Sequence, residues 1–318
     1  MSTPKKPTIL YLFLFILIYS CSEKPLLDEE EANVLEIALG AKSQTPPFEG
    51  PFVFFKDLSY AAGPRNKLDL FLPKSEKIRG VVLFFHGGAF LFGTKETLYE
   101  DEFKDLIEKL LDENIAVVNS EYTFINDPDA EGVFTSLEDG TKVIQFIKEK
   151  SNILNLPENQ FILAGVSAGA GIAQWNGFRE ETNSSIKGVV AIIAQSSYDL
   201  YQWEQLFPDF SLDRLRKTEP ELEELLLRFY NGEPTPEKAT ILDYRSEMDA
   251  DDPALFVYNP VYEENFITLE NTIDFNVLFH SYKHADFLRK KASEVGLEYS
   301  GAYQESPLDF ILRKLISQ

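Results

Sequence analysis

The feature that most constrains this chain is a serine flanked by glycines at the junction of an apolar strand and a helix. The pentapeptide is Gly165-Val166-Ser167-Ala168-Gly169. Residues 161–164 before it predict a buried strand, and the proline-free stretch 168–178 predicts a helix. Both glycines are needed, because side chains there would collide where the strand packs on the helix. The pattern predicts that the Ser167 hydroxyl is exposed at the carboxyl edge of a sheet, with the Ala168 N–H facing the same space.

A second glycine motif lies well upstream and also follows an apolar run. Residues 81–85 predict a buried strand that leads directly into His86-Gly87-Gly88-Ala89-Phe90. This stretch resembles the H-G-G-G oxyanion-hole loop of the α/β-hydrolase superfamily, in its carboxylesterase branch of hormone-sensitive-lipase-like and BD-FAE-like members. The resemblance implies that the backbone N–H groups of Gly87, Gly88 and Ala168 form the oxyanion hole. The family's third glycine is an alanine here, which still offers its N–H.

Apolar strands alternate with helical segments along residues 51–318, in the order of this superfamily. We therefore expect an α/β-hydrolase fold, a mostly parallel eight-stranded sheet with helices on both faces. A helical lid insertion is expected at about 198–252, over the carboxyl ends of the strands, with an acidic helix at 213–230. The alternative is a surface helix without a gating role. Strands are predicted at 52–60, 67–72, 81–85, 115–119, 161–164, 188–194, 254–258 and 297–303, and the other main helices at 100–113, 136–150, 282–295 and 307–316.

A nucleophilic serine needs a base and an orienting acid, which follow it in this superfamily in the order Ser, acid, His. The resemblance places the acid just after the strand at 254–258. Counting forward from this strand favours Glu263, whereas counting back from the next helix favours Asp274. We select Asp274, because its distance to that helix is closer to the family's spacing. Either side chain could instead be an ordinary solvated carboxylate.

The histidine is not where the family has it, since residues 300–305 after the final predicted strand contain none. His86 belongs to the oxyanion motif, where the family uses its side chain to hold the loop, so the candidate bases are His280 and His284. We favour His284, because Ser281 as N-cap would place it in the first turn of a helix, where the helix dipole favours the neutral imidazole that a general base requires. The alternative is that it is only a packed side chain.

Two function classes follow from these residues. In the first, the chain is a serine hydrolase that acts on a carboxylic ester, with Ser167 as nucleophile, His284 as base and Asp274 as orienting acid. In the second, it is a non-catalytic hydrolase-fold binding protein of the cell envelope that has lost its proton relay. The partner in either case is a small-molecule acyl substrate or ligand. No cofactor and no metal is expected, and the net charge of −22 argues against nucleic acid.

The first residues predict export and lipid attachment. A pair of lysines precedes an apolar core at 9–19, which is too short to span a bilayer. The core runs into Ile18-Tyr19-Ser20-Cys21, which resembles a bacterial lipobox and contains the only cysteine of the chain. The resemblance implies a lipoprotein signal peptide at 1–20, an acidic tether at 21–50 and a lipid anchor in the outer membrane or at the cell surface.

We predict that Cys21 is the mature N-terminus and carries lipid. Metabolic labelling with a fatty-acid probe is expected to mark the wild-type protein and to leave Cys21→Ser unlabelled. Release of the wild type as an unlabelled protein that begins at another residue would contradict this prediction.

Overall fold

The computed structural model of the chain describes residues 29–267 and 272–316. The predicted signal peptide, the lipidation site Cys21 and the first part of the acidic tether lie outside these residues. None of the helices in the described part is long and apolar enough to cross a membrane.

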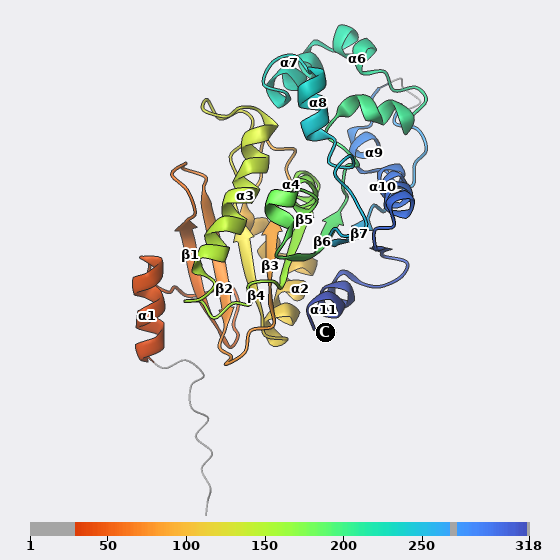
Figure 1. The fold of residues 1–318 in the computed structure, drawn as a ribbon. Coiled ribbons are helices and arrows are strands. Elements are labelled where there is room, and N and C mark those ends of the chain that lie inside the picture. The colour runs from red at the N-terminus through yellow and green to blue at the C-terminus, as the bar shows by residue number, and fades with distance from the viewer. Residues whose placement is uncertain (1–28, 268–271, 317–318) are drawn as a thin grey trace, which may run out of the picture.

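Eight strands in the described residues form one sheet in the order β1-β2-β4-β3-β5-β6-β7-β8 (Figure 1). β2 runs antiparallel to its neighbours β1 and β4, and every other pair is parallel. The predicted mostly parallel eight-stranded sheet is therefore confirmed. The strands are β1 Phe52–Ser59, β2 Lys67–Pro73, β3 Gly80–Phe85, β4 Ile115–Ser120, β5 Phe161–Val166, β6 Ile186–Ile192, β7 Ala254–Tyr258 and β8 Tyr299–Gly301.

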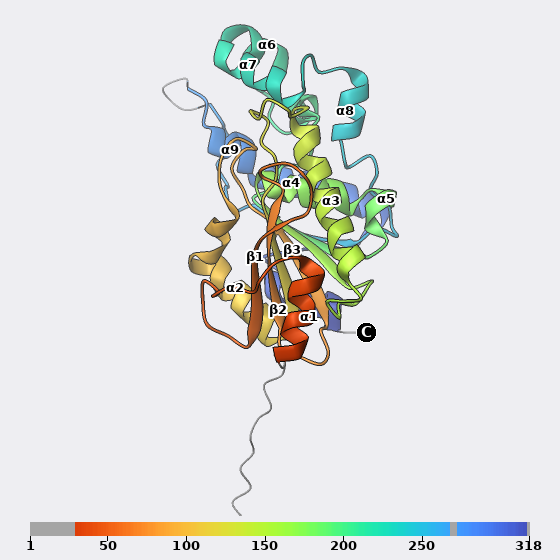
Figure 2. The ribbon, with the colours of Figure 1, turned by 90° about the vertical axis from the view of Figure 1, so that its left-hand side faces the viewer.

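Helices cover both faces of this sheet (Figure 2). Along β3, Leu83 packs into the core on one face and its neighbours Val82 and Phe84 into the core on the other, as the two-residue period of a strand requires. One face is covered by α2 (Asp101–Asp112) and α11 (Pro307–Ile316). The opposite face is covered by α3 (Val133–Lys150), α4 (Ala168–Gly177) and α10 (Tyr282–Val295). Two short helices also lie between β3 and β6, namely η1 Lys95–Tyr99 and α5 Glu180–Asn183.

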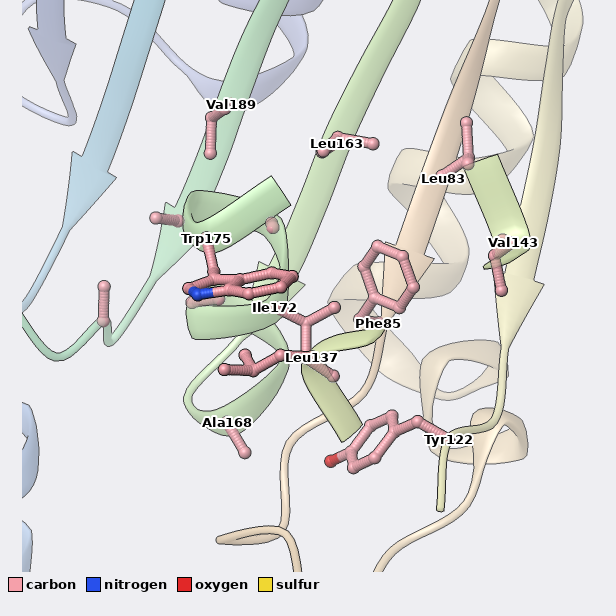
Figure 3. Packing of buried hydrophobic residues seen from close by; sticks show 14 of the residues in the cluster. Leu83, Phe85, Tyr122, Leu137, Val143, Leu163, Ala168, Ile172, Trp175 and Val189 are labelled. Atoms are coloured by element: carbon pink, nitrogen blue, oxygen red, sulfur yellow. The ribbon is translucent and has the colours of Figure 1, made fainter. Parts of the chain in front are cut away.

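α4 approaches the sheet more closely than side chains would permit. A Cβ atom on Gly165 would lie 2.1 Å from the carbonyl oxygen of Gly169, and one on Gly169 would lie 2.0 Å from that of Phe85. Around this contact, Ile172 and Trp175 of α4 pack among apolar side chains of the strands and of α3 (Figure 3). The two glycines of the serine motif are thus required by backbone-to-backbone packing, as the sequence predicts.

Part of the predicted tether packs on the domain. Residues Glu29–Leu39 form helix α1, and Leu35 on this helix is buried in one core of the sheet. Phe48 is buried in the other core, where its ring stacks on that of Phe71. Residues 29–50, which belong to the predicted tether, are therefore partly packed against the domain.

The segment between β6 and β7 forms short helices above the carboxyl ends of the strands (Figure 1). The single helix expected at 213–230 is broken into two at Pro220, because proline restricts the residue before it and begins a new helix readily. The connection after β7 contains the six-residue helix α9 (Phe275–His280), which is not among the helices predicted from the sequence. The helices of the insertion are η2 Leu200–Gln205, α6 Leu212–Thr218, α7 Pro220–Phe229 and α8 Pro236–Leu242.

Gly169→Ala is expected to lower the free energy of unfolding by more than about 3 kcal/mol, because its Cβ would overlap a backbone carbonyl that cannot move without shifting β3. Urea unfolding followed by circular dichroism measures the loss. Gly40→Ala is the control: its Cβ meets no atom within 4 Å, so it should cost only about 1 kcal/mol for its positive φ. A Gly169→Ala protein as stable as the control would contradict the close approach.

Candidate active site

Ser167 occupies the turn between β5 and α4 in a strained conformation. Its φ of 51° and ψ of −114° lie in a region that residues other than glycine rarely adopt. The turn is held at the sheet edge by a hydrogen bond of 2.9 Å from the Ser167 N–H to the carbonyl oxygen of Ile192 on β6. The predicted junction of a strand and a helix at Ser167 is confirmed.

The glycine loop after β3 lies directly against this serine. A Cβ atom on Gly87 would lie 3.5 Å from Cβ of Ser167 and 3.1 Å from the carbonyl oxygen of Val166. The two motifs, which are far apart in the sequence, therefore meet because β3 and β5 are parallel neighbours in the sheet.

Backbone donors for an oxyanion are available around Ser167. Within residues 29–267 and 272–316, the N–H groups of Gly87, Gly88, Ala89 and Ala168 have no protein acceptor. Gly88 and Ala89 both have positive φ, and Ala89 lines the same pocket as Ser167 and Ala168, whereas Gly87 and Gly88 do not line it. Gly87, Gly88 and Ala168 of the sequence-based set therefore all keep an N–H near Ser167 that is unpaired within the described residues, and Ala89 offers a further one.

The glycine loop is held by the residues that follow β4. The hydroxyl of Tyr122 donates to the carbonyl oxygen of His86 at 3.0 Å, and the two rings stack with centroids 4.4 Å apart. Nε2 of the fully buried His86 lies 3.4 Å from the Glu121 carboxylate, which also pairs with Arg65 and accepts from the Lys95 N–H. Burial raises the pKa of Glu121, but its contacts with His86, Lys95 and Arg65 outweigh this and hold the pKa below its ordinary value. His86 therefore holds the loop, as the resemblance implied.

His280 is the histidine that the structure brings to the serine. Its Nε2 lies 3.0 Å from Oγ of Ser167, and its Nδ1 lies 2.9 Å from Oδ1 of Asn276. An amide oxygen only accepts, so Nδ1 carries the hydrogen and the Nε2 lone pair faces the serine hydroxyl. Burial lowers the pKa of His280 below its ordinary value, which keeps the imidazole neutral near pH 7. This is the tautomer and charge state that a general base requires.

The choice of His284 over His280 is corrected by the structure. Ser281 does cap α10, by accepting from the Lys283 N–H, and His284 does lie in its first turn. The side chain, however, points into the core: Nδ1 accepts from the Ser196 N–H at 3.2 Å, and Nε2 donates to the carbonyl oxygen of Leu278 at 2.9 Å. Burial lowers the pKa of His284 to about 4. Both of its nitrogens are occupied, so it serves the packing of α9 against α10 and not the serine.

The choice of acid is corrected as well. The carboxylate of Asp274 accepts from the N–H groups of Asn276 and Val277 and so caps the N-terminus of α9. Glu263, the other candidate, is an exposed side chain in the connection after β7. In the part of the chain that the structure describes, the Nδ1 partner of His280 is Asn276. Asn276 and His280 are four residues apart, so their side chains are neighbours only if the segment is a helix. The sequence pattern predicts no helix here and therefore does not pair them.

A second asparagine holds the end of α9. Asn259 follows β7, where the family has its acid, and its Nδ2 lies 3.1 Å from the His280 carbonyl oxygen and 3.2 Å from that of Ser281. The same side-chain amide bonds both the N–H and the carbonyl oxygen of Ala194 after β6. The base is thus positioned by the connection after β7, and not by the loop after β8 as in the family.

An apolar pocket of about 120 Å³ opens beside Ser167. Helix α7 of the insertion forms part of the pocket wall, so the insertion lies next to Ser167. In the described residues, no group of three or more histidine, cysteine, aspartate or glutamate side chains is arranged to hold a metal ion. The pocket is lined by Ala89, Phe90, Ile125, Ser167, Ala168, Gln195, Tyr198, Leu200, Trp203, Leu222, Leu225, Leu226, Phe229 and Phe279.

Residues 68–207 match the family described as BD-FAE, a range that includes both glycine motifs. A search of the curated proteins finds no match.

Solved esterase structures are similar to most of the chain. A truncated carbohydrate esterase from gut microbiota is 13% identical with a TM-score of 0.61, over 85% of this chain and 99% of that one. Esterase B from Lactobacillus rhamnosis is 15% identical with a TM-score of 0.56, over 86% and 79%. Propionate-bound esterase 2 of Thermogutta terrifontis is 14% identical with a TM-score of 0.53, over 77% and 80%. At these identities the likeness establishes the fold.

Proposed function

We propose that this chain, which has the fold of the solved esterases and matches the BD-FAE family over residues 68–207, hydrolyses a carboxylic ester through an acyl-enzyme on Ser167. The observation that carries the proposal is the contact of 3.0 Å between the Ser167 Oγ and the unprotonated Nε2 of His280. A serine and a neutral imidazole in hydrogen-bond reach, beside free backbone donors, are the parts that acyl transfer requires.

The proposed reaction follows from this geometry. The Ser167 Oγ attacks the ester carbonyl carbon while His280 Nε2 accepts the hydroxyl proton. N–H groups from the set Gly87, Gly88, Ala89 and Ala168 stabilise the negative oxygen of the tetrahedral intermediate. The alcohol then leaves with the proton from His280. Water attacks the acyl-enzyme by the same route in reverse, so that the carboxylic acid is released and Ser167 is restored.

The non-catalytic alternative rested on the missing histidine after the last strand. With His280 against Ser167, that reason no longer favours it. A protein that only bound a ligand would also have no need of the strained φ at Ser167, which costs about 1–3 kcal/mol.

We propose that the apolar pocket receives the acyl part of the ester. Its volume of about 120 Å³ is a little less than the roughly 150 Å³ of an apolar cavity that binds benzene, so the acyl group should have about six heavy atoms or fewer. Leu225, Leu226 and Phe229 of α7 contribute to the wall, which makes the insertion the element that limits acyl length.

Replacing the proposed nucleophile and base is expected to remove activity without unfolding the protein. Ser167→Ala and His280→Ala should each lower kcat on a short p-nitrophenyl ester by at least about a thousandfold, because the two residues act as a unit. His284→Ala is the contrasting variant: it should cost about 2–4 kcal/mol of stability, since it leaves buried partners unpaired and a cavity. Its folded fraction should keep the wild-type kcat. Full activity of His280→Ala would exclude this base.

Acyl-chain preference tests the role of α7. The wild type should prefer p-nitrophenyl butyrate to the decanoate, because the longer chain exceeds the pocket. Leu225→Ala should move kcat/KM toward longer chains by several-fold, whereas Leu227→Ala is the control, since this half-buried leucine of the same helix does not line the pocket. A shift of equal size in both variants, or in neither, would contradict the assignment of the pocket.

A further inference from the structure

We infer that Asn276 is the positioning residue of the base, so that the site uses a Ser167–His280–Asn276 arrangement with an uncharged amide where the family has a carboxylate. The inference rests on the proposed function and names a residue that neither the motifs nor the family pattern indicate.

Helix α9 holds both residues in a fixed geometry. Asn276 and His280 are one helical turn apart, so both side chains lie on the same side of the helix. The helix is fixed at its start by the Asp274 cap and at its end by the Asn259 amide, which binds the His280 carbonyl oxygen. With the backbone held at both ends, the bond of 2.9 Å between the His280 Nδ1 and the Asn276 Oδ1 sets the rotation of the imidazole. Nε2 is then presented to Ser167 in the required tautomer.

An amide and a carboxylate differ in what they do after the proton has moved. Both accept a hydrogen bond from Nδ1–H and so fix the tautomer. Only a carboxylate also stabilises the positive imidazolium by its charge, which raises the pKa of the base. A site with an asparagine therefore orients its base without raising the pH at which the base becomes protonated.

The surroundings of His280 supply no compensating charge. The ring faces the Ser167 hydroxyl from the turn after β5 and Asn276 from its own helix, and the ring of Phe279 lies edge-on to it, whereas the Asn259 amide contacts only the His280 backbone carbonyl. His284 of α10 interacts electrostatically with His280, but burial lowers the pKa of His284 to about 4, so His284 is neutral over most of the working range. In the described residues no carboxylate or cation pairs with the His280 ring, and burial alone lowers its pKa. The activity should accordingly persist below pH 6.5, until this base is protonated.

The test is a direct titration of His280 combined with a pH–rate profile. The chain has three histidines, so their ring signals can be assigned by NMR from single substitutions. In a Ser167→Ala background, Asn276→Asp is expected to raise the His280 pKa by at least about one unit, because a carboxylate then faces Nδ1. In the active protein, the same substitution should move the acid limb of kcat/KM upward by a similar amount. Asn276→Ala should lower kcat by about 10- to 100-fold with KM little changed.

Asp274→Asn is the matched control, because asparagine caps a helix as well as aspartate does. It should leave both the His280 titration and the acid limb where they are. An unmoved His280 titration in Asn276→Asp would overturn the inference, whatever the activity of the enzyme. A moved titration with no ester hydrolysis in either the wild type or Asn276→Asp would instead overturn the proposed function, and the positioning role with it.

Discussion

The site depends on a contact between backbones in which no side chain can take part. β5, the Ser167 turn and α4 pack so closely on β3 that a methyl group on Gly165 or Gly169 would overlap a carbonyl oxygen. Because the turn cannot relax, Ser167 is held at a positive φ and its hydroxyl remains at the carboxyl edge of the sheet. The glycine loop after β3 is placed against the serine by the same parallel pairing of β3 with β5. The same backbone contact therefore stabilises the fold and positions the serine.

The other half of the site is positioned mostly by neutral hydrogen bonds. Asn259 ties the end of α9 to the loop after β6, and Asn276 orients the imidazole. On the opposite side, charged residues hold the glycine loop, where Glu121 links His86 and Arg65. The protein thus places its charges behind the oxyanion loop and keeps them away from the base, which fits a base whose pKa lies below the ordinary value.

The features that were predicted correctly from the sequence are those that local residue patterns determine. The sheet, its covering helices, the strained serine, the glycine loop and the position of the insertion follow from apolar periodicity and from glycines at fixed spacing. The correct choice between His280 and His284 depends on which of the two side chains points into the core. The position of His284 in the first turn of a helix does not determine the direction of its side chain. Asp274 resembled a triad acid in spacing, yet its carboxylate satisfies the N–H groups of a short helix that the hydrophobic pattern did not reveal. Asn276 could be found only once that helix was known.

The central claim is that Ser167 is an activated nucleophile, and covalent labelling tests it most directly. A fluorophosphonate should add once to the wild-type chain, and peptide mass spectrometry should locate the adduct on Ser167. The rate should fall steeply when His280 is replaced, while labelling of Asp274→Asn should match the wild type. An intact protein that takes up no label, or one whose label lies on another residue, would contradict the account.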